Sequence, residues 1–397
     1  MKEFDVVVIG GGIHGAGVLQ AAVAAGHSAL LIERRAIASG TSSRSSKLIH
    51  GGLRYLESGQ FRLVRESLHE RSVQLQTAPE LVQLKPFYIP VYRTTRRRPW
   101  QLRLGLLAYA ILGGFRAGTG FGSVPRSQWQ QLDGLDTRDL DAVIRYHDAQ
   151  TDDALLTRAV FRSAQDLGAE VAMPASFVEA ELDDGGVRIG YEETTDNGSA
   201  MRECHARVMV NAAGPWATHV ARDVRPAIDI PRVDLVQGTH IVVPVETRAG
   251  IYYVENPADG RAVFIMPWQG STMIGTTETP FHGEPDQVQP LPEEEQYLLN
   301  VAQVYFPPLR GLTRADITNR FAGLRVLPAG DVQAFGRSRE TMLIGDRAER
   351  PRVLGIYGGK LTAWRATAEQ VMEKIETSLP RRRSRASTED LPLRRSL

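Results

Sequence analysis

Residues 4–33, FDVVVIGGGIHGAGVLQAAVAAGHSALLIE, decide the fold class of this chain. An apolar, β-branched run over 4–9 ends in three glycines, and an alanine-rich stretch over 16–25 follows it. This order predicts a strand, a tight turn and a helix. The second apolar run, 29–32, has no polar alternation, which is typical of a parallel strand buried on both faces. The chain therefore opens with a β-α-β unit.

The glycines of the turn, Gly10, Gly12 and Gly15, have the spacing of a dinucleotide-binding motif. Glycine allows the tight turn and lets backbone N–H groups and the helix N-terminus approach a pyrophosphate. Glu33 ends the second strand, where a carboxylate can accept hydrogen bonds from an adenosine ribose. A turn without a nucleotide is the alternative, but the complete unit favours FAD or NAD. The acid also disfavours NADP, which the two following arginines would otherwise suit.

Length and composition indicate a globular protein with more than one domain. The chain has 397 residues, 42% hydrophobic and 23% charged, and single cores seldom grow past roughly 250 to 300 residues. A net charge of +1 gives no reason to expect nucleic acid. The single cysteine, Cys204, excludes an internal disulfide and a CxxC motif. No apolar run reaches the ~20 residues of a spanning helix and no leader precedes the first strand, so we expect a cytoplasmic protein.

Four further segments resemble the signature motifs of the FAD-dependent glycerol-3-phosphate dehydrogenases. In the family's order they are 41–57 (TSSRSSKLIHGGLRYLE), 211–216 (NAAGPW), 238–244 (GTHIVVP) and 358–362 (GGKLT). The resemblance covers residues 4 to about 376. It implies the fold of the D-amino-acid-oxidase-like flavoproteins, with FAD as the cofactor. The implied reaction is oxidation of sn-glycerol 3-phosphate to dihydroxyacetone phosphate, by hydride transfer from C2 to flavin N5, with quinone or another acceptor taking the electrons.

The expected architecture is an α/β fold in which a Rossmann-type FAD-binding domain is interleaved with an antiparallel β-sheet substrate domain. Short β-rich runs between 235 and 277 favour the antiparallel sheet. The FAD-binding domain is expected over residues 1–75, 145–225 and 325–378, and the substrate domain over residues 76–144 and 226–324. Residues 379–397 are rich in arginine and poor in apolar side chains, which predicts a disordered basic tail.

The other cofactor contacts are predicted on the family motifs. Hydroxyl groups over 41–46 can donate to the pyrophosphate and the flavin edge, and paired glycines let the backbone pass close to the ring. Gly358-Gly359 before a helix can aim N–H groups at the flavin N1–C2=O edge, where negative charge collects on reduction. The candidates are Thr41, Ser42, Ser46, Lys47, Gly51, Gly52, Ala213, Gly214, Trp216, Gly359, Lys360, Leu361 and Thr362.

The substrate residues are predicted from the chemistry of a phosphate monoester and from motif positions. Arg54 and Arg325 match family positions that hold the substrate, and Lys360 can assist, because a phosphate needs fixed positive charge and a fork of donors. A base must take the proton of the C2 hydroxyl group while hydride leaves. Neutral imidazole suits this step, so His240 is the first choice and His50 the alternative. No metal site is predicted.

A basic and apolar segment suggests a peripheral contact with the inner face of the cytoplasmic membrane. Residues 96–100 combine three arginines with a tryptophan, and 102–115 is largely apolar, which is typical of an interfacial patch. Related dehydrogenases are peripheral membrane enzymes, although burial of the segment between domains is the alternative. Family members usually continue into a helical C-terminal domain, and because the resemblance ends near residue 376 we expect a short form without it. Locally, Val326 and Glu278 replace the family's proline and aspartate.

Two other functions stay open on the sequence. In the first, the protein is a related flavin oxidase or dehydrogenase for another 2-hydroxy acid or an amine, and Arg54 and Arg325 grip a carboxylate. In the second, it is a non-catalytic flavin-binding protein that senses redox state or a metabolite. The histidine and arginine set argues against the second.

Overall fold

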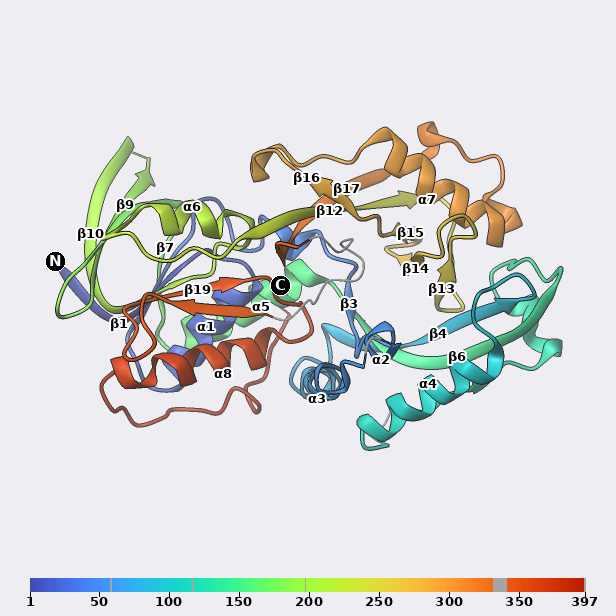
Figure 1. The fold of residues 1–397 in the computed structure, drawn as a ribbon, viewed down its shortest axis with the longest axis horizontal. Helices are drawn as coiled ribbons and strands as arrows, with labels where there is room; N and C mark the ends of the chain where they lie inside the picture. The colour runs from blue at the N-terminus through green and yellow to red at the C-terminus, as the bar shows by residue number, and fades with distance from the viewer. Residues whose placement is uncertain (58, 116–117, 197, 331–340, 396–397) are drawn as a thin grey trace.

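Two β-sheets lie side by side along the long axis of the molecule (Figure 1). The computed structural model describes residues 1–57, 59–115, 118–196, 198–330 and 341–395. The first sheet contains the N-terminal β-α-β unit, and the second contains the β-rich runs between 235 and 277. The predicted α/β class is confirmed.

The first sheet is built around parallel strands. In hydrogen-bonded order it comprises β11 (Val224–Arg225), β8 (Ala175–Leu182), β9 (Val187–Thr195), β10 (Gly198–Asn211), β1 (Lys2–Ile9), β2 (Ala29–Ile32) and β7 (Glu170–Ala172), with β19 (Val353–Tyr357) beside β10 and β18 (Met342–Gly345) beside β19. β1 pairs parallel with β10 and β2, and β19 pairs parallel with β10. Side chains at the centre of β1 are fully buried, as expected for a strand covered on both faces.

Three helices cover one face of this sheet (Figure 1). They are α1 (Ile13–Ala24), α5 (Asp153–Asp166) and α8 (Trp364–Ile375). α1 and α8 approach closely because Gly17 has no side chain: a Cβ there would lie 2.8 Å from the Trp364 ring. The N-terminus of α5 is capped by Asp152, whose carboxylate accepts from the backbone N–H of Leu155 at 3.0 Å.

The second sheet is mainly antiparallel. It comprises β16 (Thr279–Phe281), β12 (Val233–Val243), β15 (Ser271–Gly275), β14 (Ala262–Trp268), β13 (Ile251–Glu255), β4 (Val82–Tyr92), β6 (Leu140–Thr151) and β3 (Leu48–Ile49), with β17 (Asn319–Pro328) beside β12 and β5 (Gly122–Ser123) beside β6. The helices around the second sheet are α2 (Arg54–Glu57), α3 (Phe61–Thr77), α4 (Pro99–Leu112) and α7 (Pro292–Tyr305), whereas α6 (Ala217–Arg222) packs against β8, β10 and β19 of the first sheet. β6 and β17 continue across the boundaries expected at 144/145 and 324/325. The exact division into domains stays a prediction.

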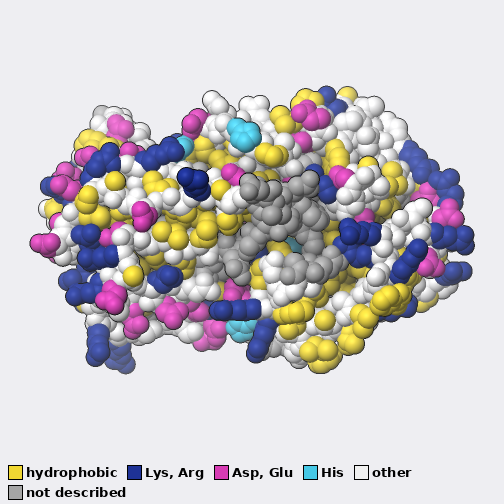
Figure 2. Space-filling view, viewed as in Figure 1, with side chains coloured by type: hydrophobic (Ala, Val, Ile, Leu, Met, Phe, Trp, Pro, Cys, Tyr) yellow, Lys and Arg dark blue, Asp and Glu magenta, His cyan; other side chains and the backbone are white. Residues whose placement is uncertain are grey.

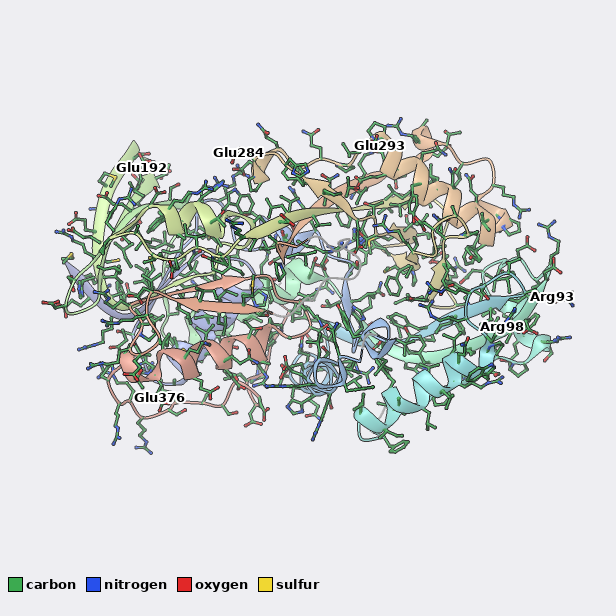
Figure 3. The ribbon with its side chains drawn as sticks, in the orientation of Figure 1. Arg93, Arg98, Glu192, Glu284, Glu293 and Glu376 are labelled. Carbon is green, nitrogen blue, oxygen red and sulfur yellow. The ribbon has the colours of Figure 1, made fainter. Side chains whose placement is uncertain are left out.

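Helix α4 buries one face and exposes the other. Leu102, Leu106 and Tyr109 are buried, the first two in the core beneath the second sheet. The opposite face leaves a row of apolar side chains exposed along one edge of the molecule (Figure 2). α4 begins after Arg98, which Figure 3 labels near Arg93 at the end of the molecule farthest from the N-terminus.

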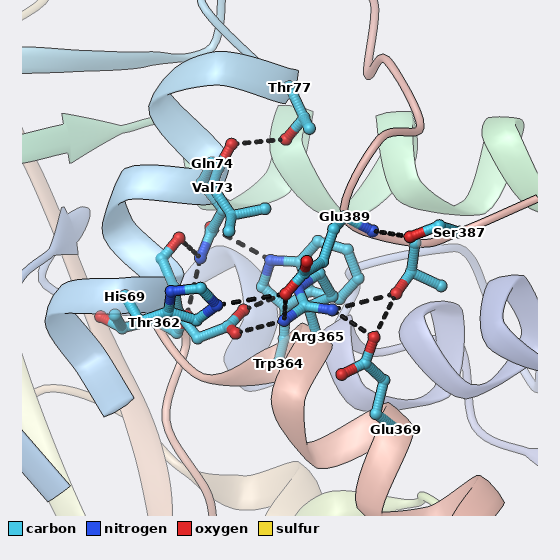
Figure 4. Close-up of polar contacts among 12 residues, drawn as sticks. His69, Val73, Gln74, Thr77, Thr362, Trp364, Arg365, Glu369, Ser387 and Glu389 are labelled. Carbon is cyan, nitrogen blue, oxygen red and sulfur yellow. Dashed lines mark hydrogen bonds and ion pairs between the residues drawn. The ribbon is translucent and has the colours of Figure 1, made fainter. Parts of the chain in front are cut away.

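The C-terminal segment corrects one prediction, because residues 379–395 are packed rather than disordered. The backbone N–H groups of Arg385 and Leu393 donate to the carbonyl oxygens of Ala24 and Thr77, each at 2.7 Å. The Leu393 side chain is only 4% exposed. Glu389 of this segment also pairs with His69 of α3 and Arg365 of α8 (Figure 4). A composition that predicts disorder is overridden here by specific ion pairs and one buried leucine.

Each helix within the described ranges is too short or too polar to cross a bilayer.

Candidate active site

A cavity of about 550 Å³ opens between the two sheets, at the carboxyl ends of β1, β2 and β10. Ligands of open parallel sheets bind at this edge. The wall on the side of the first sheet, which we call the cofactor wall, is formed by residues 9–14, 32–35, 39–42, 44–46, 212–216 and 358–362. The wall on the side of the second sheet, the substrate wall, is formed by His50, Tyr253, Arg261, Phe264, His240, Thr276, Glu278 and residues 323–327.

The glycine turn after β1 lines the cavity as predicted, with one exception. Gly10 has φ +105°, and a Cβ there would lie 2.9 Å from the carbonyl oxygen of Ala212. Gly12 also lines the cavity, whereas Gly15 faces the turn itself. A Cβ at Gly15 would lie 1.9 Å from the carbonyl oxygen of Gly10, so this glycine allows close packing of α1 against the turn.

Glu33 is fixed at the end of β2 by backbone donors. Its Oε2 accepts from the N–H of Gly11 at 2.6 Å and its Oε1 accepts from the N–H of Arg35 at 2.8 Å. Arg34 and Arg35 both pair with Asp286, at 2.9 and 3.0 Å. The two arginines therefore already have an acidic partner, which agrees with a ribose bearing free hydroxyl groups rather than a 2′-phosphate.

The hydroxyl-rich segment lies beside the N-terminus of α1. The Oγ of Ser42 accepts from the N–H of Ile13 at 2.9 Å, so it serves as a cap for a helix whose first residues carry no acidic group. Thr41, Ser42 and Ser46 all line the cavity. Gly52, Ala213, Gly214, Trp216, Gly359, Leu361 and Thr362 line it as well.

Lys47 and Gly51, by contrast, are not brought to the cavity. The Lys47 ammonium is buried against Asp153 and the carbonyl oxygen of Ser43. Burial raises the pKa of Asp153, and the adjacent Lys47 opposes that rise. Gly51 faces Tyr109 and Leu68 instead. Lys47 thus fixes the segment before β3 against α5, a partnership over 106 residues that no local pattern reveals.

The two candidate bases differ in access. His240 is 1% exposed, its ring stacks on Phe321 with centroids 5.0 Å apart, and its Nε2 lies 3.0 Å from the Oγ of Ser46. Burial lowers the pKa of His240 well below its usual value, and Arg325 and Lys47 add to the effect, so the imidazole is neutral. His50 is half-buried on the substrate wall, with its ring edge-on to Phe264.

Three described cationic side chains that bear on substrate binding line the cavity: Arg261, Arg325 and Lys360. The guanidinium of Arg325 lies 3.2 Å from the Oγ1 of Thr276 and 3.4 Å from Oε1 of Glu278. Arg261 approaches the same carboxylate at 3.5 Å. The Nζ of Lys360 lies 3.7 Å above the centre of the Tyr55 ring. Arg54 begins α2, but its side chain lies outside the described residues.

Two of the cavity residues were missed by the sequence analysis. His14 follows Gly12 in the glycine motif and lies against Gly359, where a Cβ would come within 2.3 Å of its Nε2. Its place inside the motif was a usable signal. Arg261 had no such signal, because it reaches the cavity only through the pairing of β13 with β14.

A buried carboxylate supports the substrate wall from behind. Glu294 of α7 is 4% exposed. Its oxygens accept hydrogen bonds from Gln237, Thr239, Thr277, Thr279 and the backbone N–H of Leu291. Burial alone would raise the pKa of Glu294, but the hydrogen bonds from the threonines outweigh it and lower the pKa. The network ties β12, which carries His240, to the 276–278 turn that contacts Arg325.

The residues of the cofactor wall fit FAD. Backbone N–H groups at the glycine turn and hydroxyl groups of the 41–46 segment can donate to the pyrophosphate of FAD. The Glu33 carboxylate can accept hydrogen bonds from its adenosine ribose. Gly358 and Gly359 have φ +82° and +102°, and because they carry no side chain they leave the backbone uncovered where the flavin end of the cofactor would lie. No group of three or more His, Cys, Asp and Glu in the described part of the chain is arranged to hold a metal ion.

The chain belongs to the FAD dependent oxidoreductase family, whose model matches residues 5–369. FAD is therefore its cofactor, as predicted. The fold and the cavity thus define a class of flavoprotein, in which the flavin lies between a Rossmann-type sheet and an antiparallel sheet.

Relatives narrow this class. The chain is 37% identical over 382 residues to D-erythritol 1-phosphate dehydrogenase of Brucella abortus, covering 95% of this chain and 74% of that protein. It is 37% identical to glycerol-3-phosphate dehydrogenase of Pseudomonas aeruginosa, covering 94% and 72%. Among solved structures, glycerol-3-phosphate dehydrogenase of Bacillus halodurans complexed with FAD matches with a TM-score of 0.74 and 27% identity, covering 99% of this chain and 68% of that one.

A more distant structure extends the fold alone. L-alpha-glycerophosphate oxidase of Mycoplasma pneumoniae, with FAD bound, matches with a TM-score of 0.73 at 16% identity, covering 98% of this chain and 99% of that one.

Proposed function

We propose that this protein oxidises sn-glycerol 3-phosphate to dihydroxyacetone phosphate. One observation carries the proposal: a single cavity is lined both by a wall that fits FAD and by Arg325, Arg261, Lys360 and His50. A phosphate needs such fixed cations, and an alcohol needs a base within reach. Relatives at 36 to 37% identity that are glycerol-3-phosphate dehydrogenases support the same substrate.

The protein's part in the reaction is to bind, to orient and to move one proton. The glycine turn, Glu33 and Gly359 would hold the cofactor, which when bound supplies an acceptor for the hydride from C2. Arg325 and Lys360 hold the phosphate and so place C2 relative to the histidines. A neutral imidazole, of His240 or His50, takes the proton of the C2 hydroxyl group as its oxygen becomes a carbonyl. Both electrons of the C2–H bond leave with the hydride, so the product is the ketone.

The two candidate bases, His50 and His240, differ in how much of each side chain is exposed. Both histidines line the cavity, but His50 is half-buried, whereas His240 is 1% exposed and its Nε2 lies 3.0 Å from the Oγ of Ser46. Our first choice from the sequence was His240. The exposure of His50 supports the alternative, and the variants described in the Discussion separate the two.

A second substrate has support from one relative. D-erythritol 1-phosphate has one carbon more than glycerol 3-phosphate, and the Brucella abortus dehydrogenase named for it is as similar to this chain as any glycerol-3-phosphate dehydrogenase reported above. Both compounds join a phosphate monoester to a secondary alcohol. The residues of the site support a polyol phosphate as the substrate class. The experiment below tests which carbon-chain length is preferred.

Anaerobic mixing of the yellow holoprotein with candidate substrates tests the proposal. We expect sn-glycerol 3-phosphate to bleach the flavin absorption near its visible maximum. Glycerol with inorganic phosphate is the control for a joined phosphate, and D-erythritol 1-phosphate tests chain length. Bleaching by glycine, D-alanine or a 2-hydroxy acid, with none by either polyol phosphate, would replace the proposal by the oxidase alternative.

The exposed face of α4 supports an attachment to anionic lipid, with quinone as the electron acceptor. Apolar side chains recur at helical spacing and are 43 to 69% exposed: Trp100, Leu104, Leu107, Ile111 and Phe115. Arg96 and Arg103, just before and within α4, are exposed, and Figure 2 shows Lys and Arg side chains near the apolar row. An apolar helix face edged by cations is typical of an interfacial helix. Burial of the whole segment between domains does not describe α4, because only one face is covered.

Flotation with vesicles tests the attachment. Leu104, Leu107 and Ile111 changed together to Ser should reduce recovery with anionic vesicles by about tenfold, while a matched variant with Val178 and Met201, exposed on the first sheet, changed to Ser should float like wild type. Arginine variants are poorer probes, because Arg97 pairs with Glu255. Equal absence of wild type and both variants from the lipid fraction would end the membrane proposal.

A further inference from the structure

The backbone at His50 and Gly51 is held from two sides by side-chain hydroxyl groups. The N–H of His50 donates to the Oγ1 of Thr362 at 3.1 Å, and the N–H of Gly51 donates to the hydroxyl oxygen of Tyr109 at 2.8 Å. Thr362 belongs to the cofactor wall, whereas Tyr109 lies on the buried face of α4. The segment that carries a candidate base is therefore attached to two separate elements.

Tyr109 can be only an acceptor toward Gly51. Its hydroxyl group donates to Oδ2 of Asp148 in β6, at 2.7 Å, and an ionised carboxylate can only accept. The other oxygen of Asp148 binds the guanidinium of Arg71 in α3, which also donates to the carbonyl oxygen of His147 at 3.0 Å. The direction of each hydrogen bond in this row is therefore fixed: Gly51 donates to Tyr109, Tyr109 donates to Asp148, and Arg71 donates to the other oxygen of Asp148.

The row is buried and leaves little room for adjustment. Arg71 is 2% exposed, and Tyr109 and Asp148 are each 1% exposed. A Cβ at Gly51 would lie 2.5 Å from the Tyr109 oxygen and 2.7 Å from Leu68. A glycine is thus needed for the backbone to reach this hydroxyl group, and the contact is specific to residues 51 and 109.

We infer that Tyr109 is a positioning residue for His50 and that Asp148 and Arg71 orient its hydroxyl group. The inference rests on the proposed function, in which His50 faces the alcohol. None of the three side chains lines the cavity, so they act through the backbone of Gly51. Loss of the hydroxyl oxygen frees the Gly51 N–H and lets the His50 ring turn away from the reacting hydroxyl group. Misplacement of a base lowers the rate of the chemical step and leaves phosphate binding intact.

The test compares Tyr109→Phe with Tyr252→Phe in the FAD-loaded protein. Tyr252 is a matched control, because it is also buried and donates to a carboxylate, Asp133, at 2.8 Å, but it does not line the cavity. Among the described residues, the backbone N–H groups of His50 and Gly51 donate to Thr362 and Tyr109 rather than to Tyr252. We expect Tyr109→Phe to slow flavin reduction at saturating sn-glycerol 3-phosphate by about tenfold or more, with apparent affinity changed less than about twofold. Tyr252→Phe should leave both constants unchanged while lowering the melting temperature to a similar degree.

Two measurements without substrate keep the inference separate from the proposed function. Hydrogen exchange of the Gly51 amide should accelerate in Tyr109→Phe and not in Tyr252→Phe, and the His50 imidazole signal, identified by its loss in His50→Gln, should shift only in Tyr109→Phe. If no polyol phosphate bleaches the wild type, the proposed function fails while these measurements still decide the inference. The inference is overturned if, in Tyr109→Phe, the Gly51 amide exchanges at the wild-type rate and the His50 imidazole signal does not shift. It is also overturned if Tyr109→Phe and Tyr252→Phe lose the same fraction of the flavin reduction rate.

Discussion

The cofactor wall and the substrate wall of one cavity are built by different means. The cofactor wall is made mainly of backbone: glycine turns at Gly10–Gly12 and Gly358-Gly359, a helix N-terminus, and a carboxylate held by the N–H of Gly11. The substrate wall is made of charged and aromatic side chains that reach the cavity from strands distant in sequence. Behind it, Glu294 accepts hydrogen bonds from hydroxyl groups of β12, β16 and the 276–278 turn. A wall of backbone is encoded locally, and a wall of side chains is encoded by tertiary packing.

The largest effect is expected from the candidate bases of the substrate wall. His50→Ala or His240→Ala, whichever removes the base, should slow flavin reduction by about a hundred- to ten-thousandfold in anaerobic stopped-flow. Because the pKa of His240 lies well below its usual value, a rate that depends on His240 should not fall between pH 8 and about 6. Wild-type rates in both variants would mean that neither histidine is the base.

A smaller effect on the same wall is expected from its cations. Arg325→Ala should raise the KM for sn-glycerol 3-phosphate by about ten- to hundredfold, because a charge-assisted hydrogen bond contributes about 1.5 to 3 kcal/mol. The limiting reduction rate should change much less, since a dianion held equally in ground and transition states gives uniform binding. Arg320→Ala is the control, because Arg320 lies on the same strand and pairs with Glu295. A fall confined to the limiting rate would contradict a binding role.

The cofactor wall should respond through affinity for FAD. Glu33→Ala should weaken FAD binding to the apoprotein by about tenfold, through loss of a contact worth about 1 to 2 kcal/mol and of the support for the Gly11 backbone. Quenching of flavin fluorescence measures this directly, and Glu192→Ala, an exposed site at the far end of the first sheet (Figure 3), is the control. An unchanged dissociation constant would remove Glu33 from the cofactor site.

The smallest effect concerns stability. The pKa of Glu294 is lowered in the folded protein, so its contribution to stability is complete above the pKa of the unfolded chain and is lost as pH falls through the folded value. Glu294→Gln should cost about 1 to 3 kcal/mol of unfolding free energy at pH 7, and less below about pH 4. Denaturant unfolding at several pH values measures this difference. A difference that grows toward acid pH would show that the carboxylate is not the form that these hydroxyl groups stabilise.

The two walls also explain what could be predicted from sequence. The β-α-β unit, Gly10, Gly12 and Glu33 follow from one local pattern, and the structure places them in the cavity. Segments such as 41–46 and 358–362 were located by resemblance rather than by periodicity. Arg261 reaches the cavity only through strand pairing, and Lys47 lies against Asp153 instead of the cavity. Such partners are separated by up to several hundred residues, and no local propensity encodes them.

The packed C-terminal segment shows the same limit. Its arginines and polar residues predict disorder, yet Leu393 is buried against the end of α3. The prediction failed because composition takes no account of partners such as His69 and Arg365, to which Glu389 binds.

The strand order of the first sheet has a consequence for how the chain reaches its native state. β1 pairs with β10, where Val7 lies opposite Met209, and β10 pairs with β19, where Met209 lies opposite Val353. β1 can pair early with β2, but its other edge must wait for β10, which is synthesised much later. Long-range parallel pairing is slow and leaves strand edges exposed meanwhile. Because the glycine turn follows β1 and Gly359 follows β19, the flavin can complete its contacts only at the end of folding, and free FAD during refolding should raise the yield of native protein by mass action.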